Sequence, residues 1–498
     1  MTHSGWLCIA LAIGIVACSS EPRDLDEDTG LRVTSLKPAD GATDVPWATT
    51  FEATLSAALD PASIGRDAIE LTLGGTVVPS VITYDAASRT LRLAAPLLPG
   101  LTYRAELKPG LRTAEGDSLS EGRVWTAATR PWAPAVVSSI GEFDFSDLTL
   151  DPLGGVHLFG FGEYHPYSDY FIPYLTYVSC PLSCENPASW GRVVLDSAFE
   201  PSYSKALEVD GTGGVYLVHA ARLTEFPGHH EIRYGTCPSD CLSPGNWAVG
   251  TIRSEATTDR LENVAGFARD DGGRLHLVIQ AAGLNPGLLY ATCQTGCTQA
   301  ANWSSALIPV GGYSFDAGKN FTVDPSGRLH LFTEYALVES YSTCPSDCLS
   351  PAQWSTTPAE WPGAHSVSMS HAVDAAGRVH LVFTEGTAFT YARCEANCVA
   401  PASWSTVPLD GGDYHGSALT VDEAGRITAL NPVESSGELR FLTCVSDCLQ
   451  AANWQKAVVD HPDIFGSPDM GSPRMALGPD GRPRMTYSST ARALRYLE

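Results

Sequence analysis

The sequence predicts an all-β chain in which an N-terminal β-sandwich is followed by a seven-bladed β-propeller. Three observations predict this. The 498 residues include 46 Gly and 34 Pro but only 17% charged residues, which suits short strands and tight turns. Residues 31–130 carry short runs in which apolar and polar side chains alternate. Residues 131–498 repeat one pattern every 50 to 57 residues, as repeat architectures do.

Charge and cysteine content restrict the function and the compartment. The formal net charge of −25 argues against nucleic acid as a partner, because phosphate binding needs clustered Lys and Arg. Fourteen cysteines indicate an oxidising compartment. We expect no cofactor and no bound metal, and we expect a monomer.

The first 17 residues read as a secretion signal. The apolar run from Trp6 to Ala17 is too short to span a bilayer. It ends in Ile15-Val16-Ala17-Cys18, which resembles the lipobox of bacterial lipoproteins, although no Lys or Arg precedes it. The resemblance implies export, lipid modification of Cys18 (a palmitate-type anchor), and a place at the outer membrane facing the periplasm or the cell surface. The alternative is an ordinary cleaved signal. Residues 18–30 are acidic and read as a solvated tether.

Residues 31–130 predict a β-sandwich. The strand-like runs are Phe51–Leu55, Ile69–Leu73, Thr90–Leu93 and Tyr103–Leu107. The segment also resembles the bacterial Ig-like domains of surface-layer type in Pro38–Pro46, Tyr84-Asp85, Leu98–Tyr103, Gly110-Leu111 and Ala114–Leu119. The resemblance implies a spacer or adhesion module without catalytic residues.

The second region is built on a cassette of two cysteines, with three residues between them, followed by a tryptophan. An aromatic residue stands three positions before each first cysteine. The cassettes are Cys180/Cys184/Trp190, Cys237/Cys241/Trp247, Cys293/Cys297/Trp303, Cys344/Cys348/Trp354, Cys394/Cys398/Trp404 and Cys444/Cys448/Trp454. Each pair can reach disulfide distance. Zinc is the weaker alternative, because one pair supplies only two of the four ligands that zinc needs.

An Asp-x-x-Gly motif lies between two strands upstream of each cassette and predicts a hairpin turn. The copies begin at Asp151, Asp210, Asp270, Asp324, Asp374 and Asp422, and a seventh, degenerate copy spans Leu477–Arg482. Each unit then holds four strands, which is one propeller blade. The seventh unit lacks its fourth strand, so we expect Trp132–Val137 to pair with Ala493–Leu497 and close the ring.

Two repeated residue types have a structural and a functional interpretation. The tryptophans are expected to pack between neighbouring blades, with sugar stacking as the alternative. The histidines His157, His276, His330 and His380 are expected to be structural, because four blades cannot share one metal unless all of them face the axis.

A binding site is expected where the repeats differ, in the segments that follow the second strand of each unit. These segments include Phe161–Phe171 and His219–Glu231. The candidates for ligand contact are Tyr164, His165, Tyr167, Tyr170, His229, His230, Glu334 and Glu385. We expect the first domain to lie beneath the ring, which leaves this variable face turned outward.

The predicted function is that of a non-catalytic, lipid-anchored surface protein that binds a glycan or a protein partner. The alternative is a hydrolase or lyase acting on polysaccharide. The Asp-x-x-Gly turn resembles the sialidase-like class of propeller repeats, but the Ser-x-Asp-x-Gly-x-x-Trp form of that class is absent. A glycosidase needs two carboxylates across the bond. No catalytic residue is assigned, and Glu163, Glu334 and Glu385 are the only carboxylates to test.

Overall fold

The computed structural model describes residues 30–46, 49–95, 97–137, 143–162, 174–196, 199–223, 229–256, 263–281, 287–310, 320–335, 338–357, 369–412, 416–423, 425–433, 436–461, 473–479, 481–488 and 494–498. The predicted signal peptide and Cys18 lie outside these residues. The described chain is all-β, with helical structure restricted to 3₁₀ turns of three residues. Within the described chain, no helix is long and apolar enough to cross a bilayer.

The first domain is a sandwich of two sheets, as predicted. One sheet has the order β1-β3-β7-β6 and the other β2-β9-β8-β4-β5. Their inward residues alternate with exposed ones, as in β3, where Phe51, Ala53 and Leu55 are buried. The bounds are β1 Val33–Lys37, β2 Ala42–Val45, β3 Phe51–Leu55, β4 Ile69–Leu73, β5 Thr76–Val77, β6 Val81–Asp85, β7 Thr90–Ala94, β8 Thr102–Leu107 and β9 Arg123–Thr129.

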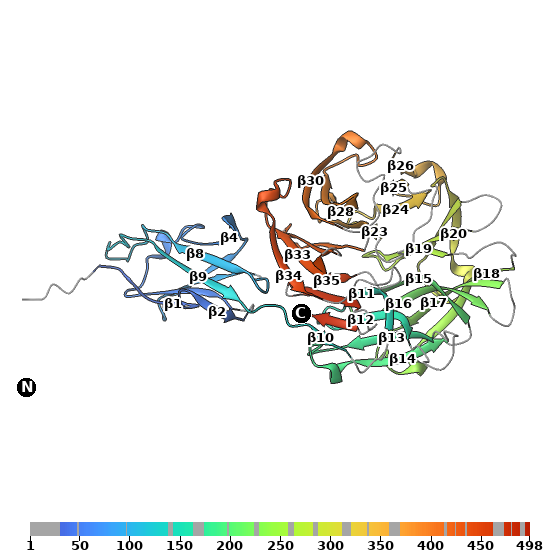
Figure 1. The fold of residues 1–498 in the computed structure, drawn as a ribbon, viewed down its shortest axis with the longest axis horizontal. Helices are drawn as coiled ribbons and strands as arrows, with labels where there is room; N and C mark the ends of the chain where they lie inside the picture. Colours follow the sequence, from blue (N-terminus) through green and yellow to red (C-terminus); the bar gives the residue numbers. More distant parts are fainter. Residues whose placement is uncertain are drawn as a thin grey trace, which may run out of the picture.

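The repeats form successive four-stranded antiparallel sheets, each in simple chain order. Figure 1 shows these sheets arranged around a common centre, which makes the second region propeller-like. The bounds are β11 Phe143–Leu150, β12 Val156–Gly162, β13 Tyr174–Cys180, β14 Gly191–Asp196; β15 Phe199–Val209, β16 Val215–Leu223, β17 His229–Cys237, β18 Ala248–Ala256; β19 Asn263–Arg269, β20 Leu275–Ala281, β21 Gly287–Cys293, β22 Ser304–Ile308; β23 Phe321–Val323, β24 Leu329–Tyr335, β25 Val338–Cys344, β26 Ser355–Thr356; β27 Met369–Val373, β28 Val379–Glu385, β29 Ala388–Cys394, β30 Trp404–Gly411; and β31 Ala418–Val421, β32 Ile427–Val433, β33 Glu438–Cys444, β34 Gln455–Asp460.

One further sheet joins the two ends of the repeat region. Its strands β35 (Arg474–Leu477), β36 (Pro483–Ser488) and β37 (Leu494–Leu497) come from the last repeat, and β10 (Ala135–Val136) pairs with β37 as the fourth strand. Ala135 lies opposite Tyr496, and the N–H of Val137 donates to the carbonyl of Leu494 at 2.8 Å. The pairing predicted between these two segments is therefore present.

Neighbouring sheets are joined by contacts between a tryptophan and an aromatic residue. In each contact a tryptophan at or just before the start of an outer strand packs on an aromatic side chain of the adjacent sheet. That side chain lies three residues before the first cysteine of its repeat. In the last repeat, which has no cysteine pair, it lies at the equivalent position. The ring centroids are 5.2–6.0 Å apart in Tyr177–Trp247, Tyr234–Trp303, Tyr290–Trp354, Tyr341–Trp404, Tyr391–Trp454, Phe441–Trp132 and Tyr496–Trp190. The packing role predicted for the tryptophans is confirmed.

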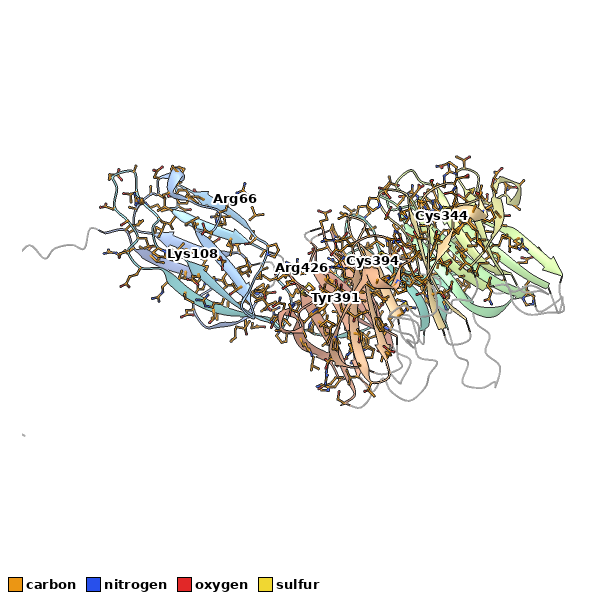
Figure 2. All side chains as sticks on the ribbon, turned by 90° about the horizontal axis from the view of Figure 1, so that it is seen from above. Arg66, Lys108, Cys344, Tyr391, Cys394 and Arg426 are labelled. Carbon is orange, nitrogen blue, oxygen red and sulfur yellow. A yellow bond between two sulfur atoms is a disulfide. The ribbon has the colours of Figure 1, made fainter. Side chains whose placement is uncertain are left out.

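The Ig-like sandwich packs against the outer side of sheet β31–β34. Gly74 lies so close to Gln455 that a Cβ atom on residue 74 would be 1.8 Å from the side-chain amide nitrogen of Gln455. Trp132 and Phe441 belong to the same buried cluster as the core of the sandwich. Figures 1 and 2 place the sandwich beside the ring, with Arg426 at the junction. The expectation that this domain lies beneath the ring is therefore wrong, because the apolar contact with β33 and β34 determines its position.

Candidate functional site

Each Asp-x-x-Gly turn is held by the side chain of its own aspartate. In the turn before β24, Oδ1 of Asp324 accepts hydrogen bonds from the backbone N–H groups of Ser326 and Arg328 at 2.8 and 2.9 Å. Gly327 has a φ of 83°, which glycine adopts without steric cost. The predicted hairpin turn is confirmed, and its geometry leaves Oδ2 of the aspartate for a second partner.

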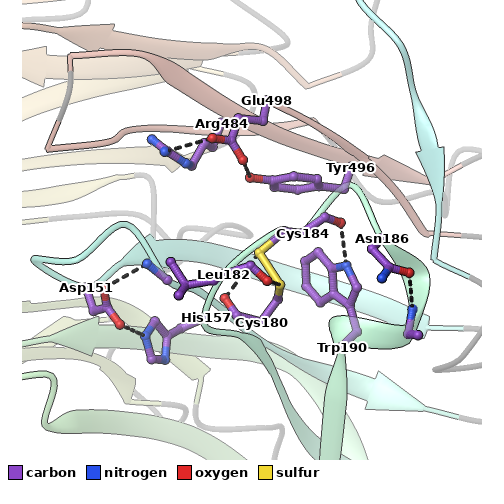
Figure 3. The surroundings of a disulfide bond; sticks show 12 residues. Asp151, His157, Cys180, Leu182, Cys184, Asn186, Trp190, Arg484, Tyr496 and Glu498 are labelled. Carbon is purple, nitrogen blue, oxygen red and sulfur yellow. Dashed lines mark hydrogen bonds and ion pairs between the residues drawn. A yellow bond between two sulfur atoms is a disulfide. The ribbon is translucent and has the colours of Figure 1, made fainter.

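That second partner is the histidine at the start of the next strand. Nε2 of His330 lies 3.3 Å from Oδ2 of Asp324, and Nδ1 lies 2.8 Å from the hydroxyl of Tyr341 on β25. Three other sheets contain the same cluster of Asp, His and Tyr: Asp151/His157/Tyr177, Asp270/His276/Tyr290 and Asp374/His380/Tyr391. Figure 3 shows the Asp151–His157 contact beside the first cassette.

The electrostatics of this cluster determine the tautomer of the histidine. A carboxylate can only accept, so Nε2 of His330 carries the proton and Nδ1 accepts from the tyrosine. Burial lowers the pKa of His330, against the opposing effect of Asp324. Burial also raises the pKa of Tyr341 to about 12. The ring is therefore neutral near pH 7 and both nitrogens are occupied, which confirms the structural role predicted for these histidines.

The cysteine loops complete the same edge of each sheet, and the predicted disulfides are present. The Cα–Cα distances are 5.7–5.8 Å in Cys180–Cys184, Cys237–Cys241, Cys293–Cys297, Cys344–Cys348, Cys394–Cys398 and Cys444–Cys448. The residue before each second cysteine has a positive φ, a conformation that Gly, Asn and Asp tolerate best. Among the described residues, no group of three or more His, Cys, Asp or Glu is placed to hold a metal ion.

The second cysteine of each pair lies beyond the end of its strand and is nevertheless buried. The exposed fractions are 2–8% for Cys184, Cys241, Cys297, Cys348, Cys398 and Cys448. The backbone carbonyl of each of these cysteines accepts a hydrogen bond from the indole six residues later. The distances are 2.8 Å for Cys184 (Figure 3), 2.8 Å for Cys241, 2.7 Å for Cys297 and 2.8 Å for Cys448. These cysteines are therefore part of the scaffold and not an exposed binding surface.

The predicted ligand-contact residues are only partly described. Tyr164, His165, Tyr167 and Tyr170, and also Glu163, lie outside the described residues. His229 begins β17 and Glu334 lies near the end of β24, so their strand positions are known. Glu385 ends β28 and is exposed. His230 is 7% exposed within β17.

The segment His219–Glu231 was expected to follow the second strand of its unit, and for its described residues this expectation is wrong. β16 continues to Leu223 and β17 begins at His229, so the hairpin is longer than its sequence pattern indicates. His219 is fully buried against Phe159 of the neighbouring sheet. Burial therefore removes His219 from the exposed surface, and His230 can contribute only through a small exposed part.

A groove of about 650 Å³ lies between sheets β23–β26 and β27–β30, on the face opposite the variable face. It is bordered by the Asp-x-x-Gly turns and the cysteine loops of both sheets. Of the second cysteines described above, Cys398 lines the groove. Cys241, Cys297 and Cys448 belong to the loops of other sheets and do not line it. Its polar lining includes Ser326, Arg328, Gln353, Ser355 and Asn397. Its volume is that of a small-molecule site. Sequence reasoning missed this groove, because it assigned the turns and cysteine loops to the scaffold alone.

A pair of carboxyl groups on the innermost strands was also missed. Asp147 of β11 is 9% exposed and accepts hydrogen bonds from the N–H groups of Leu148 and Leu207. The pKa of Glu208 on β15 is raised to about 8. Burial is the main cause and the charge of Asp147 adds to it, whereas the charge of Arg269 acts in the opposite direction. A carboxyl group with a raised pKa near a second carboxyl group is an arrangement that acid–base catalysis also uses.

Comparisons with known proteins identify the family of the first domain. No curated protein matches the chain. Similar solved structures include an α-L-arabinanase from Penicillium chrysogenum complexed with arabinobiose (12% identity, TM-score 0.42, covering 65% of this chain and 94% of that one). Others are the NanB sialidase from Streptococcus pneumoniae (11%, 0.39, 90% and 82%) and the polysaccharide lyase Uly1 (9%, 0.42, 72% and 90%). Residues 27–129 match the family described as bacterial Ig-like domain, so the sandwich is such a domain.

Proposed function

We propose that the chain is an exported, lipid-anchored and non-catalytic binding protein. In this proposal the Ig-like domain is a spacer, and the repeat region is a closed seven-bladed propeller that binds a glycan or a protein partner. The binding surface is the variable face, at the ends of the strands that point away from the cysteine loops. The protein acts as a monomer.

Closure of the ring is supported by the contacts at its two ends. Trp132 and Tyr496 come from opposite ends of the repeat region, and each takes part in one of the seven aromatic contacts between sheets. The innermost strand β35 also lies beside β11 of the first repeat. A ring in which each of these seven tryptophans packs on the next sheet has no exposed edge sheet.

Hydrogen exchange tests the closure. The amide of Val137 should exchange slowly in the full chain, because it donates to Leu494. A chain that lacks residues 494–498 should lose this protection and keep that of β20. Fast exchange at Val137 in the full chain would contradict a closed ring.

The observation that carries the binding proposal is the length of sheet β15–β18. Its strands contain 11, 9, 9 and 9 residues, whereas β23–β26 contain 3, 7, 7 and 2. Both sheets have their cysteine at the same end, so the additional residues extend toward the variable face. There Arg222, His230 and Glu255 occupy paired positions on neighbouring strands. A projecting edge with basic and acidic positions in register suits recognition of a polar partner.

A glycan array probed with the soluble fragment from Leu31 tests this function. Specific binding should be lost in Tyr164→Ala and weakened in His230→Ala. The control is Leu153→Ala, because Leu153 is 84% exposed on an Asp-x-x-Gly turn of the opposite face. Binding that survives in Tyr164→Ala and is lost in Leu153→Ala would place the site on the wrong face.

The lipid anchor is supported by the lipobox-like sequence before Cys18 and by the acidic segment after it. Labelling of cells with radioactive palmitate should mark the parent protein in the membrane fraction. Cys18→Ala should be unlabelled and soluble. An unlabelled parent protein would show that the leader is an ordinary cleaved signal.

One observation favours the alternative of polysaccharide hydrolysis. Glu208, with its pKa raised to about 8, could donate a proton beside the second carboxyl group, that of Asp147. Incubation with soluble polysaccharides should then release reducing ends, and Glu208→Gln should abolish the release. Binding without turnover would leave the non-catalytic function as the supported one.

A further inference from the structure

We propose that the groove between sheets β23–β26 and β27–β30 is a second binding site, for a small carboxylate-bearing sugar of the uronic acid class. This site is separate from the variable face and lies on the side of the turns and cysteine loops. The volume of about 650 Å³ fits a ligand of one or two sugar rings.

The main argument is the state of Arg328. The equivalent arginines of the next two repeats are bound to their own turn aspartates, Arg378 to Asp374 at 2.6 Å and Arg426 to Asp422 at 2.8 Å. Within the described part of the chain, Arg328 makes no such ion pair, although Asp324 bonds to its histidine just as Asp374 does. Arg328 lines the groove, and in our proposal its guanidinium binds the incoming anion.

The two carboxylates that line the groove, Asp324 and Glu395, already have other partners. Asp324 accepts from the hydroxyl and N–H of Ser326, from the N–H of Arg328 and from His330. Although burial opposes it, these bonds lower the pKa of Asp324. Glu395 is bound by Arg393 at 2.7 Å. Neither carboxylate is therefore joined to Arg328 in an ion pair.

The remaining polar groups suit the hydroxyls of a sugar. The amides of Gln353 and Asn397 and the hydroxyl of Ser355 line the groove, and they make no side-chain hydrogen bond to any other described residue. A guanidinium binds a carboxylate through two parallel hydrogen bonds, whereas amides and hydroxyls can donate to or accept from sugar hydroxyls. A uronate carries both kinds of group on one ring.

Calorimetric titration of the full chain in detergent tests the site. The probes are glucuronate, galacturonate and mannuronate, with glucose as the neutral control and glucose 6-phosphate as the phosphate control. At least one uronate should bind saturably, and at least tenfold more tightly than glucose. Absence of uronate binding, or tighter binding of glucose 6-phosphate, would overturn the proposal.

Two matched pairs of variants locate the binding. Arg328→Gln should weaken uronate binding at least tenfold, whereas Arg274→Gln, at the same position of the preceding repeat, should not. Ser355→Tyr should block the groove, and Ser304→Tyr, again one repeat earlier, should not. Equal effects within both pairs would overturn the site. Tyr164→Ala should leave uronate binding unchanged, so failure at this groove and failure at the variable face are distinguishable.

Discussion

Sheet β31–β34 lacks both the tyrosine hydroxyl and its histidine acceptor. Tyr341 donates to His330, whereas the equivalent positions of sheet β31–β34 are Phe441 and Thr428. A buried histidine nitrogen that loses its donor costs about 1–3 kcal/mol. Because Thr428 replaces the histidine, Phe441 leaves no histidine nitrogen without its donor.

A double-mutant cycle tests this dependence. Tyr341→Phe should lower the free energy of unfolding by about 1–3 kcal/mol, because Nδ1 of His330 stays buried without its partner. His330→Thr with Tyr341→Phe reproduces the natural pair and should cost less than the sum of the single variants, with a coupling of about 1 kcal/mol or more. Urea unfolding measures all three variants. Additive costs would show that the two side chains are independent.

The pKa of Glu208 makes stability depend on pH. Burial and Asp147 raise this pKa from 4.5 to about 8. The folded protein keeps a proton that the unfolded chain has released, so the contribution of Glu208 to stability falls as pH rises from about 4.5 to about 8. Glu208→Gln removes this contribution. Its stability relative to the parent should increase across that range in urea unfolding, and a constant difference would contradict the assignment.

At the scale of the element, each cysteine loop supports the tryptophan that follows it. The indole N–H of Trp354 donates to the carbonyl of Cys348 at 2.9 Å, and the disulfide fixes the loop that presents this carbonyl. Cys344→Ala with Cys348→Ala should lower the free energy of unfolding by about 2 kcal/mol, the loop-closure value for so short a ring. Urea unfolding followed by tryptophan fluorescence measures it. An unchanged midpoint would show that the bridge adds nothing to the packed sheet.

The regular part of each sheet could be predicted because the same side chains recur at the same spacing. The Asp-x-x-Gly hairpins, the paired cysteines and the packed tryptophans all follow from local geometry. The ends of the hairpins could not be predicted in this way. His219 and His229 lie in strands, but there the sequence no longer alternates between apolar and polar residues. The role of Tyr341 as a donor to His330 was missed, although the two residue types recur together.

At the scale of the whole molecule, the groove between two sheets and the contact between the two domains could not be predicted. The groove beside Arg328 depends on how two sheets pack, and no single repeat contains it. The place of the Ig-like domain likewise depends on a contact between Trp132 and Phe441 rather than on strand direction. Sequence periodicity describes one repeat at a time, whereas these features arise from packing between repeats and between domains.

Trp132 connects the sandwich to the repeat region. It lies at the end of the linker, packs on Phe441 of sheet β31–β34, and belongs to a buried cluster that includes Leu98 and Leu101 of the sandwich. Because this cluster is continuous, we expect the sandwich and the repeat region to unfold in one calorimetric transition. Trp132→Ala should cost about 3–5 kcal/mol and separate this transition into two.

The matched control is Trp454→Ala, which removes an indole that packs on Tyr391 within the repeat region. It should lower the midpoint by a comparable amount but preserve the single transition, because the contact with the sandwich is intact. If both variants unfold in one transition, the domains are coupled by other contacts, such as that of Gly74 with Gln455. If the parent already shows two transitions, the shared cluster does not couple the domains energetically.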